Sequence, residues 1–321
     1  MKSCPSRPQE RSMTGCDQIS PLEFRGRLIV HVGIHKTGTT SIQGVLDAEY
    51  ERLRDNGILY PKAGRGIKNE IVMPLHHPLI LSLIDDNDQA AFFHIEALRT
   101  EIHEAAPTTV IISSEVLSRE YLSSQVFRDI QRIFPEASRT WMIYLRRQDR
   151  LAMSRYAEGI KTGVVAWPDN IRHTLQPINL DHRLRLERLQ HAVGHDTIVP
   201  VPFDATKNRL MASFFEAADL EMMVAPPMAQ HANASLPWGT LQLLRIANAM
   251  PGSAKHFTRR VVRALTRRIS ATRASRMLDW SEPLSSQQAS DVRKRYEASN
   301  RWVEEKFWND RRFFTGSEQE F

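Results

Sequence analysis

The sequence predicts a three-layer α/β fold, with a mainly parallel central sheet of about five strands and a helical extension at the C-terminus. Short β-branched runs alternate with segments of helical spacing, and this alternation implies helical crossovers between parallel strands. The first run ends at a glycine and leads into a helical pattern, which is the usual opening of an α/β unit. After about residue 230 the β-branched runs stop and only helical patterns remain.

Each expected element follows from a local pattern. Short apolar runs bounded by polar residues predict buried strands at 28–32, 58–61, 109–113, 141–145 and 197–203. Apolar residues three and four positions apart predict core helices at 39–56, 89–105, 124–134, 149–161 and 180–193. The same spacing predicts C-terminal helices at 236–250, 257–269 and 285–307. Ser285 is a suitable cap for the last of these.

The elements divide the chain into three predicted parts. The N-terminal tail is rich in Ser, Pro, Gln and Arg, which predicts disorder, and it lacks the apolar segment of a secretory signal. Met13 is an alternative start within it. Both cysteines, Cys4 and Cys16, lie in this tail, so we expect no disulfide framework and a reducing, cytoplasmic location. The predicted parts are the tail 1–24, an α/β core 25–230 and a helical extension 231–321 packed on the core.

Charge is unevenly distributed along the 321 residues. Lys and Arg number 43 against 37 Asp and Glu, for a formal net charge of +6. Eight of these cations, with no acid among them, form a basic block: Lys255, Arg259, Arg260, Arg263, Arg267, Arg268, Arg273 and Arg276. Such a block suits nucleic acid, an anionic membrane or an acidic small molecule, and composition does not choose among them. No run of about 18 uncharged apolar residues predicts a transmembrane span.

The turn after the first strand is the most informative segment. Residues 31–43 read His-Val-Gly-Ile-His-Lys-Thr-Gly-Thr-Thr-Ser-Ile-Gln. Gly33 and Gly38 have the spacing of a P-loop, whose backbone N–H groups wrap an anion at a helix N-terminus. A nucleotide triphosphatase has its lysine after the second glycine, whereas Lys36 lies two residues before it. Four hydroxyl residues add donors at the helix start: Thr37, Thr39, Thr40 and Ser41. The alternative is a glycine-containing turn that binds nothing, with hydroxyls as helix caps.

This loop resembles the 5′-phosphosulfate loop of the sulfotransferases that use 3′-phosphoadenosine 5′-phosphosulfate (PAPS), especially the bacterial members. The resemblance is carried by Lys-Thr-Gly-Thr-Thr and extends from about Leu28 to the final helices. It implies a P-loop NTPase-like fold and transfer of a sulfuryl group from PAPS to a hydroxyl or amine acceptor. Lys36 would be the catalytic lysine that stabilises the leaving phosphate. The implied phosphosulfate contacts are His35, Lys36, Thr37, Gly38, Thr39, Thr40 and Ser41.

A second segment, residues 144–156, follows the fourth predicted strand. The family pairs an arginine at a strand end with a serine eight residues on to bind the 3′-phosphate, and Arg146 and Ser154 have that spacing. A strand-end guanidinium and a hydroxyl one to two helical turns later can converge on one phosphate. The family's commoner Arg-x-Pro is absent, because Arg147 and Gln148 follow, so Arg147 could replace Arg146. Surface ion pairs are the alternative for either arginine.

A hydroxyl acceptor also needs a group that removes its proton. We expect His77 first, then His76, then Glu115. The two histidines follow the second strand, where family members commonly place acceptor-side residues, and Glu70 lies in the same segment. Glu115 ends the third strand, where other branches of the family carry a base or a lysine. Loop packing and helix capping are the alternatives. The scheme needs no metal, and adjacent histidines point apart, so we expect no metal site.

Two other functions stay open. A P-loop kinase using ATP or GTP is disfavoured because Thr39 follows Gly38 and no Mg²⁺-binding Asp clearly ends an apolar strand. A basic nucleotide- or anion-binding protein without transfer activity is the second alternative. In it the 255–276 helix, with one apolar face, would contact nucleic acid or an anionic membrane.

The narrower hypothesis for the basic block is that Arg259 or Arg260 closes over the 3′-phosphate of the nucleotide. If the chain is a sulfotransferase, no nucleic-acid partner is needed to explain its excess of basic residues. The acceptor is then expected to be a small molecule or glycan, such as a carbohydrate or glycolipid. The sequence specifies neither that acceptor nor the oligomeric state.

Overall fold

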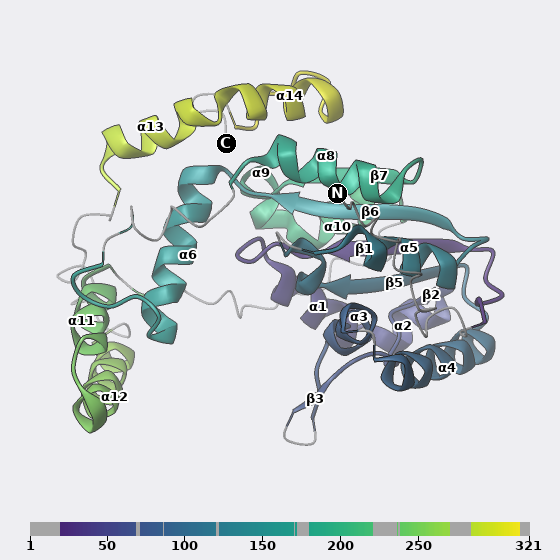
Figure 1. Ribbon diagram of the computed structural model, residues 1–321, viewed down its shortest axis with the longest axis horizontal. Coiled ribbons are helices and arrows are strands. Elements are labelled where there is room, and N and C mark those ends of the chain that lie inside the picture. Colours follow the sequence, from purple (N-terminus) through teal and green to yellow (C-terminus); the bar gives the residue numbers. More distant parts are fainter. Residues whose placement is uncertain are drawn as a thin grey trace, which may run out of the picture. The chain divides into compact units, whose positions relative to one another are not determined.

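The structure is a computed structural model, and it describes residues 20–68, 71–85, 87–119, 122–169, 171, 180–220, 236, 238–269 and 284–314 (Figure 1). Several predicted features lie outside the described residues. These are most of the N-terminal tail with Cys4, Met13 and Cys16, the boundary at residue 230, and Glu70, Arg273 and Arg276.

Five strands form one sheet in the order β2-β5-β1-β6-β7 (Figure 1). Their bounds are β1 Arg27–Val32, β2 Ile58–Leu59, β5 Thr109–Ser114, β6 Ser138–Leu145 and β7 Thr197–Pro202. The pairs β2 with β5, β5 with β1, and β1 with β6 are parallel, so the predicted fold class is confirmed. Val32 pairs with both Ser114 and Ile143, so the C-terminal ends of three strands lie at one edge. Ligands of open parallel sheets bind at that edge.

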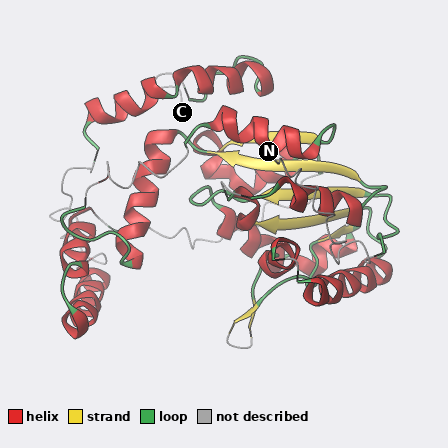
Figure 2. Cartoon of the chain, viewed as in Figure 1, coloured by secondary structure: helices red, strands yellow, loops and turns green. Residues whose placement is uncertain are grey.

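Helices connect the strands (Figure 2). Their bounds are α1 Thr39–Ala48, α2 Tyr50–Asp55, α3 His77–Ile84, α4 Asp88–Ala105, α5 Ser124–Ile133, α6 Gln148–Thr162 and α8 His182–Val193. All the predicted core helices are present, the first as two helices. The sequence analysis does not predict α3, which begins with Pro78 in its first turn. It also misses the hairpin of β3 Ile67–Lys68 and β4 Ile71–Val72.

The sheet is stable because its central strands are apolar on both faces. Leu28, Ile29 and Val30 of β1 are fully buried, as are Val110 of β5 and Trp141 of β6. Burial of one such aliphatic side chain stabilises a fold by about 1.5–3 kcal/mol. The continuous apolar runs that predicted these strands are therefore explained by their position between two helical layers.

Helices follow β7 in the described part of the chain. Their bounds are α9 Phe203–Thr206, η3 Lys207–Arg209, α10 Leu210–Ala217, α11 Trp238–Asn248, α12 Gly252–Ile269, α13 Ser286–Arg295 and α14 Glu297–Phe307. The predicted Ser285 cap is present. Its hydroxyl accepts from the Gln288 backbone N–H, and the Gln288 side chain accepts from the Ser285 N–H, which makes a capping box.

The chain forms two compact units. The sheet unit contains the described residues up to Gly33 and those of 42–143 and 188–199. The loop unit contains 34–41 and the described residues of 144–187 and from 200 onward. The apolar core of the loop unit joins α6, α11 and neighbouring segments: Tyr156, Ile160, Val165, Ile171, Leu241, Leu244 and Leu284.

Candidate functional site

The loop between β1 and α1 has an unusual backbone at two positions. Lys36 has φ 72° and Gly38 has φ 78°, both in the left-handed region. A Cβ on Gly38 would lie 2.5 Å from Leu210 Cδ2, the end of a side chain that can shift, so the left-handed backbone is what calls for glycine here. Two left-handed residues so close together tighten the turn that carries Lys36.

The hydroxyl residues of the loop fall into two groups. Thr37 and Thr39 are buried, and their hydroxyls donate to the Ile34 carbonyl at 2.7 and 3.3 Å. These two side chains therefore hold the loop in shape. Thr40 and Ser41 are exposed in the first turn of α1, where their hydroxyls and the helix N-terminus can meet an anion. His35, at the other side of Lys36, is also exposed.

The ammonium of Lys36 donates to Glu158 Oε2 at 2.6 Å. Glu158 lies on α6, and its hydrogen bond from Lys36 lowers the pKa of the carboxyl group. Both side chains are partly open to solvent, with 30% and 41% of their surfaces exposed, so the pair can be separated at small cost. Sequence reasoning missed Glu158. Lys36 lies 122 residues away in the sequence, so no local pattern points to the contact. Ser154, which the sequence does indicate, lies one helical turn before Glu158 on α6.

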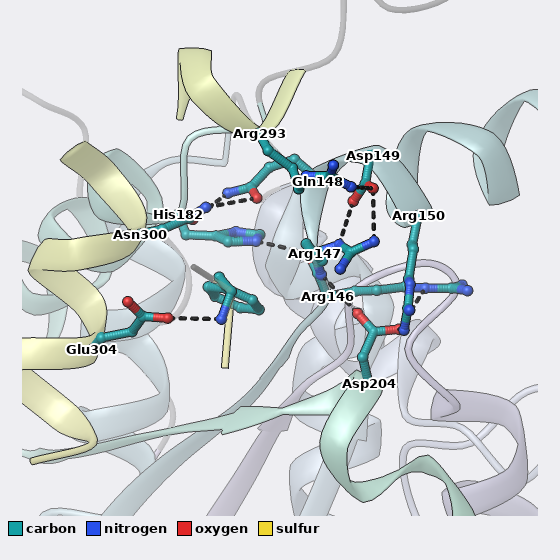
Figure 3. Close-up of polar contacts among 11 residues, drawn as sticks. Arg146, Arg147, Gln148, Asp149, Arg150, His182, Asp204, Arg293, Asn300 and Glu304 are labelled. Carbon is teal, nitrogen blue, oxygen red and sulfur yellow. Dashed lines mark hydrogen bonds and ion pairs between the residues drawn. The ribbon is translucent and has the colours of Figure 1, made fainter. Parts of the chain in front are cut away.

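Arg146 connects the end of β6 to the same loop. Its Nη1 donates to the Lys36 carbonyl at 3.0 Å, and its guanidinium lies 5.3 Å from the centre of the Phe203 ring. Its Nε lies 3.6 Å from Asp204 Oδ1, and Nη1 of Arg150 lies 3.4 Å from the same oxygen (Figure 3). Burial lowers the pKa of Arg146, and the Asp204 carboxylate opposes that shift.

Five residues thus form what we call the loop cluster: Lys36, Arg146, Arg150, Glu158 and Asp204. It holds three cations and two carboxylates, and therefore has a formal positive excess. Ser154 is half-buried on α6, four residues after Arg150 and four before Glu158. This spacing places Ser154 on the face of α6 that carries the cluster. Lys36, Arg146 and Ser154, predicted from separate segments, all belong to the loop unit.

Arg147 has a different environment from its neighbour. Its guanidinium makes a bidentate ion pair with Asp149, at 2.8 and 2.9 Å, and the residue is only 6% exposed. Arg293 of α13 lies 3.2 Å from Asp149 Oδ2. The backbone N–H of Arg147 donates to Asp204 Oδ2 at 2.9 Å. This geometry favours Arg146 over Arg147 as the strand-end ligand of a phosphate (Figure 3).

Further buried polar contacts surround that ion pair. The side chains of Gln148 and Asn300 exchange two hydrogen bonds, of 2.6 and 3.1 Å. We call Arg147, Gln148, Asp149, Arg293 and Asn300 the interhelix cluster, because it joins α6 to α13 and α14. Nearby, His182 Nε2 donates to the Arg146 carbonyl at 2.8 Å, and burial lowers the pKa of His182 to about 4. This environment favours the neutral ring, and the hydrogen bond fixes the backbone at the end of β6.

The three predicted bases lie in the sheet unit, at the ends of β5 and α3. His76 is fully buried. Its Nδ1 accepts from the Ser113 N–H at 3.2 Å, so Nε2 carries the proton and donates to the Pro61 carbonyl at 3.0 Å. Burial lowers the pKa of His76 to about 3. Both ring nitrogens are thus used by the backbone, in an environment that favours the neutral ring.

His77 and Glu115 are more open than His76. His77 is half-buried at the start of α3, and its Nδ1 lies 3.1 Å from the Ser114 hydroxyl. Ser114 is the last residue of β5, and Glu115, also half-buried, begins the short 3₁₀ helix η2 Glu115–Ser118. The Ser114 hydroxyl therefore contacts His77, and Glu115 is the next residue in the chain.

A buried network that the sequence analysis does not predict lies beside these residues. His31 Nδ1 lies 2.8 Å from the Ser113 hydroxyl, which also accepts from Gln43 Nε2 at 3.0 Å. Burial lowers the pKa of His31 to about 4, and the charge of Glu115 acts in the opposite direction. His31 and Gln43 are the first and last residues of the loop segment 31–43, and this position could have identified them.

Within the described ranges, no group of three or more His, Cys, Asp and Glu side chains is arranged to hold a metal ion. None of the helices described here combines the length and the apolar character needed to cross a bilayer.

Comparison with known proteins gives a likeness to solved structures. No protein-family model matches the chain, and no curated protein matches it. Among solved structures, the crystal structure of a sulfotransferase from Alicyclobacillus acidocaldarius is 12% identical in sequence, with a TM-score of 0.38. The match covers 80% of this chain and 97% of that one. A likeness with this identity and TM-score does not assign a function to the chain.

Proposed function

We propose that this chain is a sulfotransferase that moves the sulfuryl group of PAPS to a hydroxyl or amine acceptor. The observation that carries the proposal is the hydrogen bond from Arg146 Nη1 to the Lys36 carbonyl, at 3.0 Å. Two residues 110 positions apart, each expected from its own motif to bind a phosphate of PAPS, are neighbours in one unit. PAPS carries a phosphosulfate and a separate 3′-phosphate on one ribose, so a protein that binds it needs two anion sites close together.

The loop suits the phosphosulfate end. Exposed hydroxyls of Thr40 and Ser41 and the N-terminus of α1 offer donors, and Lys36 adds a mobile positive charge. We assign Lys36 to the oxygen that bridges phosphate and sulfate, where negative charge develops as the leaving group departs. Arg146 and Ser154 would hold the 3′-phosphate, because the guanidinium has donors beyond the one that contacts the loop.

In the proposed reaction the acceptor oxygen or nitrogen forms a bond to sulfur as the bond from sulfur to the 5′-phosphate oxygen breaks. The acceptor proton passes to a base, and the products are a sulfated acceptor and adenosine 3′,5′-bisphosphate. We assign the base to His77, with Glu115 second, because both ring nitrogens of His76 are held by backbone groups. Glu158 has to release Lys36 when the phosphosulfate arrives.

Calorimetric titration tests the proposal at the binding step. Adenosine 3′,5′-bisphosphate should bind, and adenosine 5′-monophosphate, which lacks the 3′-phosphate, should bind more weakly. A chain that binds ATP with Mg²⁺ tightly and ignores the bisphosphate would instead be a P-loop kinase. A chain that binds the bisphosphate but transfers no label from radiolabelled PAPS to any small molecule, glycan or glycolipid of an extract would be a nucleotide-binding protein without transfer activity.

A further inference from the structure

The helices α11 and α12 form a hairpin whose inner side is fixed by hydrogen bonds to α6. Asn248 Nδ2 donates to the carbonyls of Ile160 and Val165, at 2.9 and 2.7 Å. Arg259 Nη2 donates to the Lys161 carbonyl at 2.5 Å, and Nη1 contacts the Asn248 side chain. A cation on the last carbonyls of α6 stabilises that helix end. Arg259 therefore has a structural partner, and Leu241 and Leu244 of α11 pack in the same core as Tyr156 and Ile160 of α6.

The outward side of the hairpin carries an exposed apolar patch. It consists of Leu243 and Ile246 on α11, Met250 in the turn that follows, and Phe257 and Val261 on α12, with exposed fractions of 41%, 46%, 37%, 71% and 38%. Residues three or four apart lie on one helix face, so each helix contributes one row. Thr258 donates to Met250 Sδ at 3.3 Å, which brings the two rows side by side. A patch of this kind on a water-soluble surface indicates a contact.

The charged residues in the sequence of the hairpin are all of one sign. From Trp238 to Leu278 the sequence contains no Asp or Glu. Within the same stretch α12 alone has six basic residues: Lys255, Arg259, Arg260, Arg263, Arg267 and Arg268. A second copy of this surface would meet it with like charges, which disfavours self-association through the patch. A nucleic acid would satisfy the cations and could stack a base on Phe257, but it would leave the aliphatic side chains of the patch without an apolar partner.

We propose that the α11–α12 hairpin docks on an anionic lipid surface. The apolar patch would enter the boundary between headgroups and acyl chains, and cations of α12 such as the half-buried Lys255 and the exposed Arg260 would contact lipid phosphates. This combination of an exposed apolar row and a basic helix with no acids is the pattern of an interfacial helix. Each Lys or Arg near an anionic membrane adds about fivefold to binding. The inference uses only the hairpin and does not depend on the proposed sulfuryl transfer.

Vesicle flotation tests the docking surface. The purified full chain is mixed with vesicles of phosphatidylcholine and phosphatidylglycerol, and in parallel with vesicles of phosphatidylcholine alone. We expect binding to the anionic vesicles and little to the neutral ones. Binding should fall steeply in about 1 M NaCl, where the Debye length is about 3 Å. Equal binding to both vesicle types, or none to the anionic vesicles, would overturn the proposal.

Two pairs of variants separate the apolar and ionic contributions. Phe257→Ser should weaken binding to anionic vesicles about tenfold, because it removes an aromatic ring that would be buried in the lipid. Its control is Phe93→Ser, which removes a ring that is 69% exposed on α4. Arg260→Gln should weaken binding about fivefold. Arg54→Gln, which removes an exposed cation from α2, is its control. Both controls should bind vesicles as the unchanged chain does.

Two further measurements test nucleic acid and a second copy of the chain as alternative partners of this surface. Binding of a mixed-sequence single-stranded RNA is measured for the unchanged chain and for Phe257→Ser. RNA binding that exceeds vesicle binding and is unaffected by Phe257→Ser would assign the basic helix to nucleic acid and overturn the proposal. Light scattering across a concentration series would overturn it if the chain dimerised and Phe257→Ser abolished the dimer. A monomer in both forms supports a lipid partner.

Discussion

Arg146 and Arg147 are adjacent at the end of β6, but they belong to clusters of different character. Arg147 and its partner Asp149 have side chains that are 7% and 5% exposed, and their ion pair is bidentate. In the loop cluster, Lys36 and Glu158 are 30% and 41% exposed and meet through a single contact. The partner of Arg147 is thus hard to replace, whereas an anionic ligand can displace Glu158 from Lys36.

The difference has a physical basis in solvation. Separating a partly exposed ion pair costs little, because water replaces the lost partner. Removing one member of a buried pair leaves a charge without solvent and costs several kcal/mol. Residues of the same type, side by side in the chain, can therefore serve stability in one place and binding in the other. Variants of the two clusters should separate these roles.

Arg147→Ala should have the largest effect, and on stability. We expect the free energy of unfolding to fall by about 3 kcal/mol, because the Asp149 carboxylate stays buried and loses its bidentate partner, although it keeps the contact with Arg293. Urea unfolding followed by circular dichroism measures this loss. A decrease no larger than that of Arg54→Ala, an exposed site, would show that the pair is not structural.

Lys36→Ala should act on turnover instead. Removing one preorganised cation from a developing charge costs about 10²–10³-fold in rate. The melting temperature should hardly change, since the Lys36 side chain is partly exposed. Single-turnover transfer from PAPS measures the rate, and Lys294→Ala on α13 is the control. If Lys36→Ala turned over at the normal rate, the lysine would have no part in the chemistry.

Arg146→Ala should weaken the binding of adenosine 3′,5′-bisphosphate about 10- to 100-fold, because hydrogen bonds to charged groups contribute about 1.5–3 kcal/mol. Adenosine 5′-monophosphate should bind both forms equally. Calorimetry with the two nucleotides checks this contrast. Loss of affinity for both would mean that Arg146 supports the loop through the Lys36 carbonyl and does not contact the 3′-phosphate.

Glu158→Gln should have a smaller effect and in the opposite direction. Lys36 no longer has to leave a carboxylate, so the bisphosphate should bind about fivefold more tightly, with a stability change below about 1 kcal/mol. Titration calorimetry and thermal melting provide the two readouts. Weaker binding in this variant would indicate that Glu158 holds Lys36 in its binding position.

Much of the fold could be predicted because its signals are local. The central strands are continuous apolar runs, and the helices between them have regular apolar spacing. The helix α3 was missed because its apolar residues follow Pro78 in a run interrupted only at Ser82, with no clear helical period. The hairpin of β3 and β4 was missed because each strand has only two residues. Packing between segments, not local pattern, determines both.

The site could be predicted in part for the same reason. Lys36 and Arg146 lie in motifs that a sequence displays directly. The structure distinguishes Arg146 from Arg147 because Asp149 pairs with Arg147. Asp149 lies two residues after Arg147 in the sequence, so this carboxylate was a usable signal. Glu158 had none, because its contact with Lys36 spans 122 residues. Likewise, nothing local in the sequence distinguishes His76, with both nitrogens satisfied, from the more open His77.

The backbone of Lys36 sets stability against function at one position. A φ of 72° is a conformation that glycine adopts freely and that other L-residues adopt at a cost of about 1 kcal/mol or more. Lys36→Gly should therefore unfold at a higher urea concentration than Lys36→Ala, although neither carries an ammonium group. A protein selected only for stability would have glycine here. The lysine makes the fold slightly weaker, and the proposed chemistry explains why the chain tolerates it.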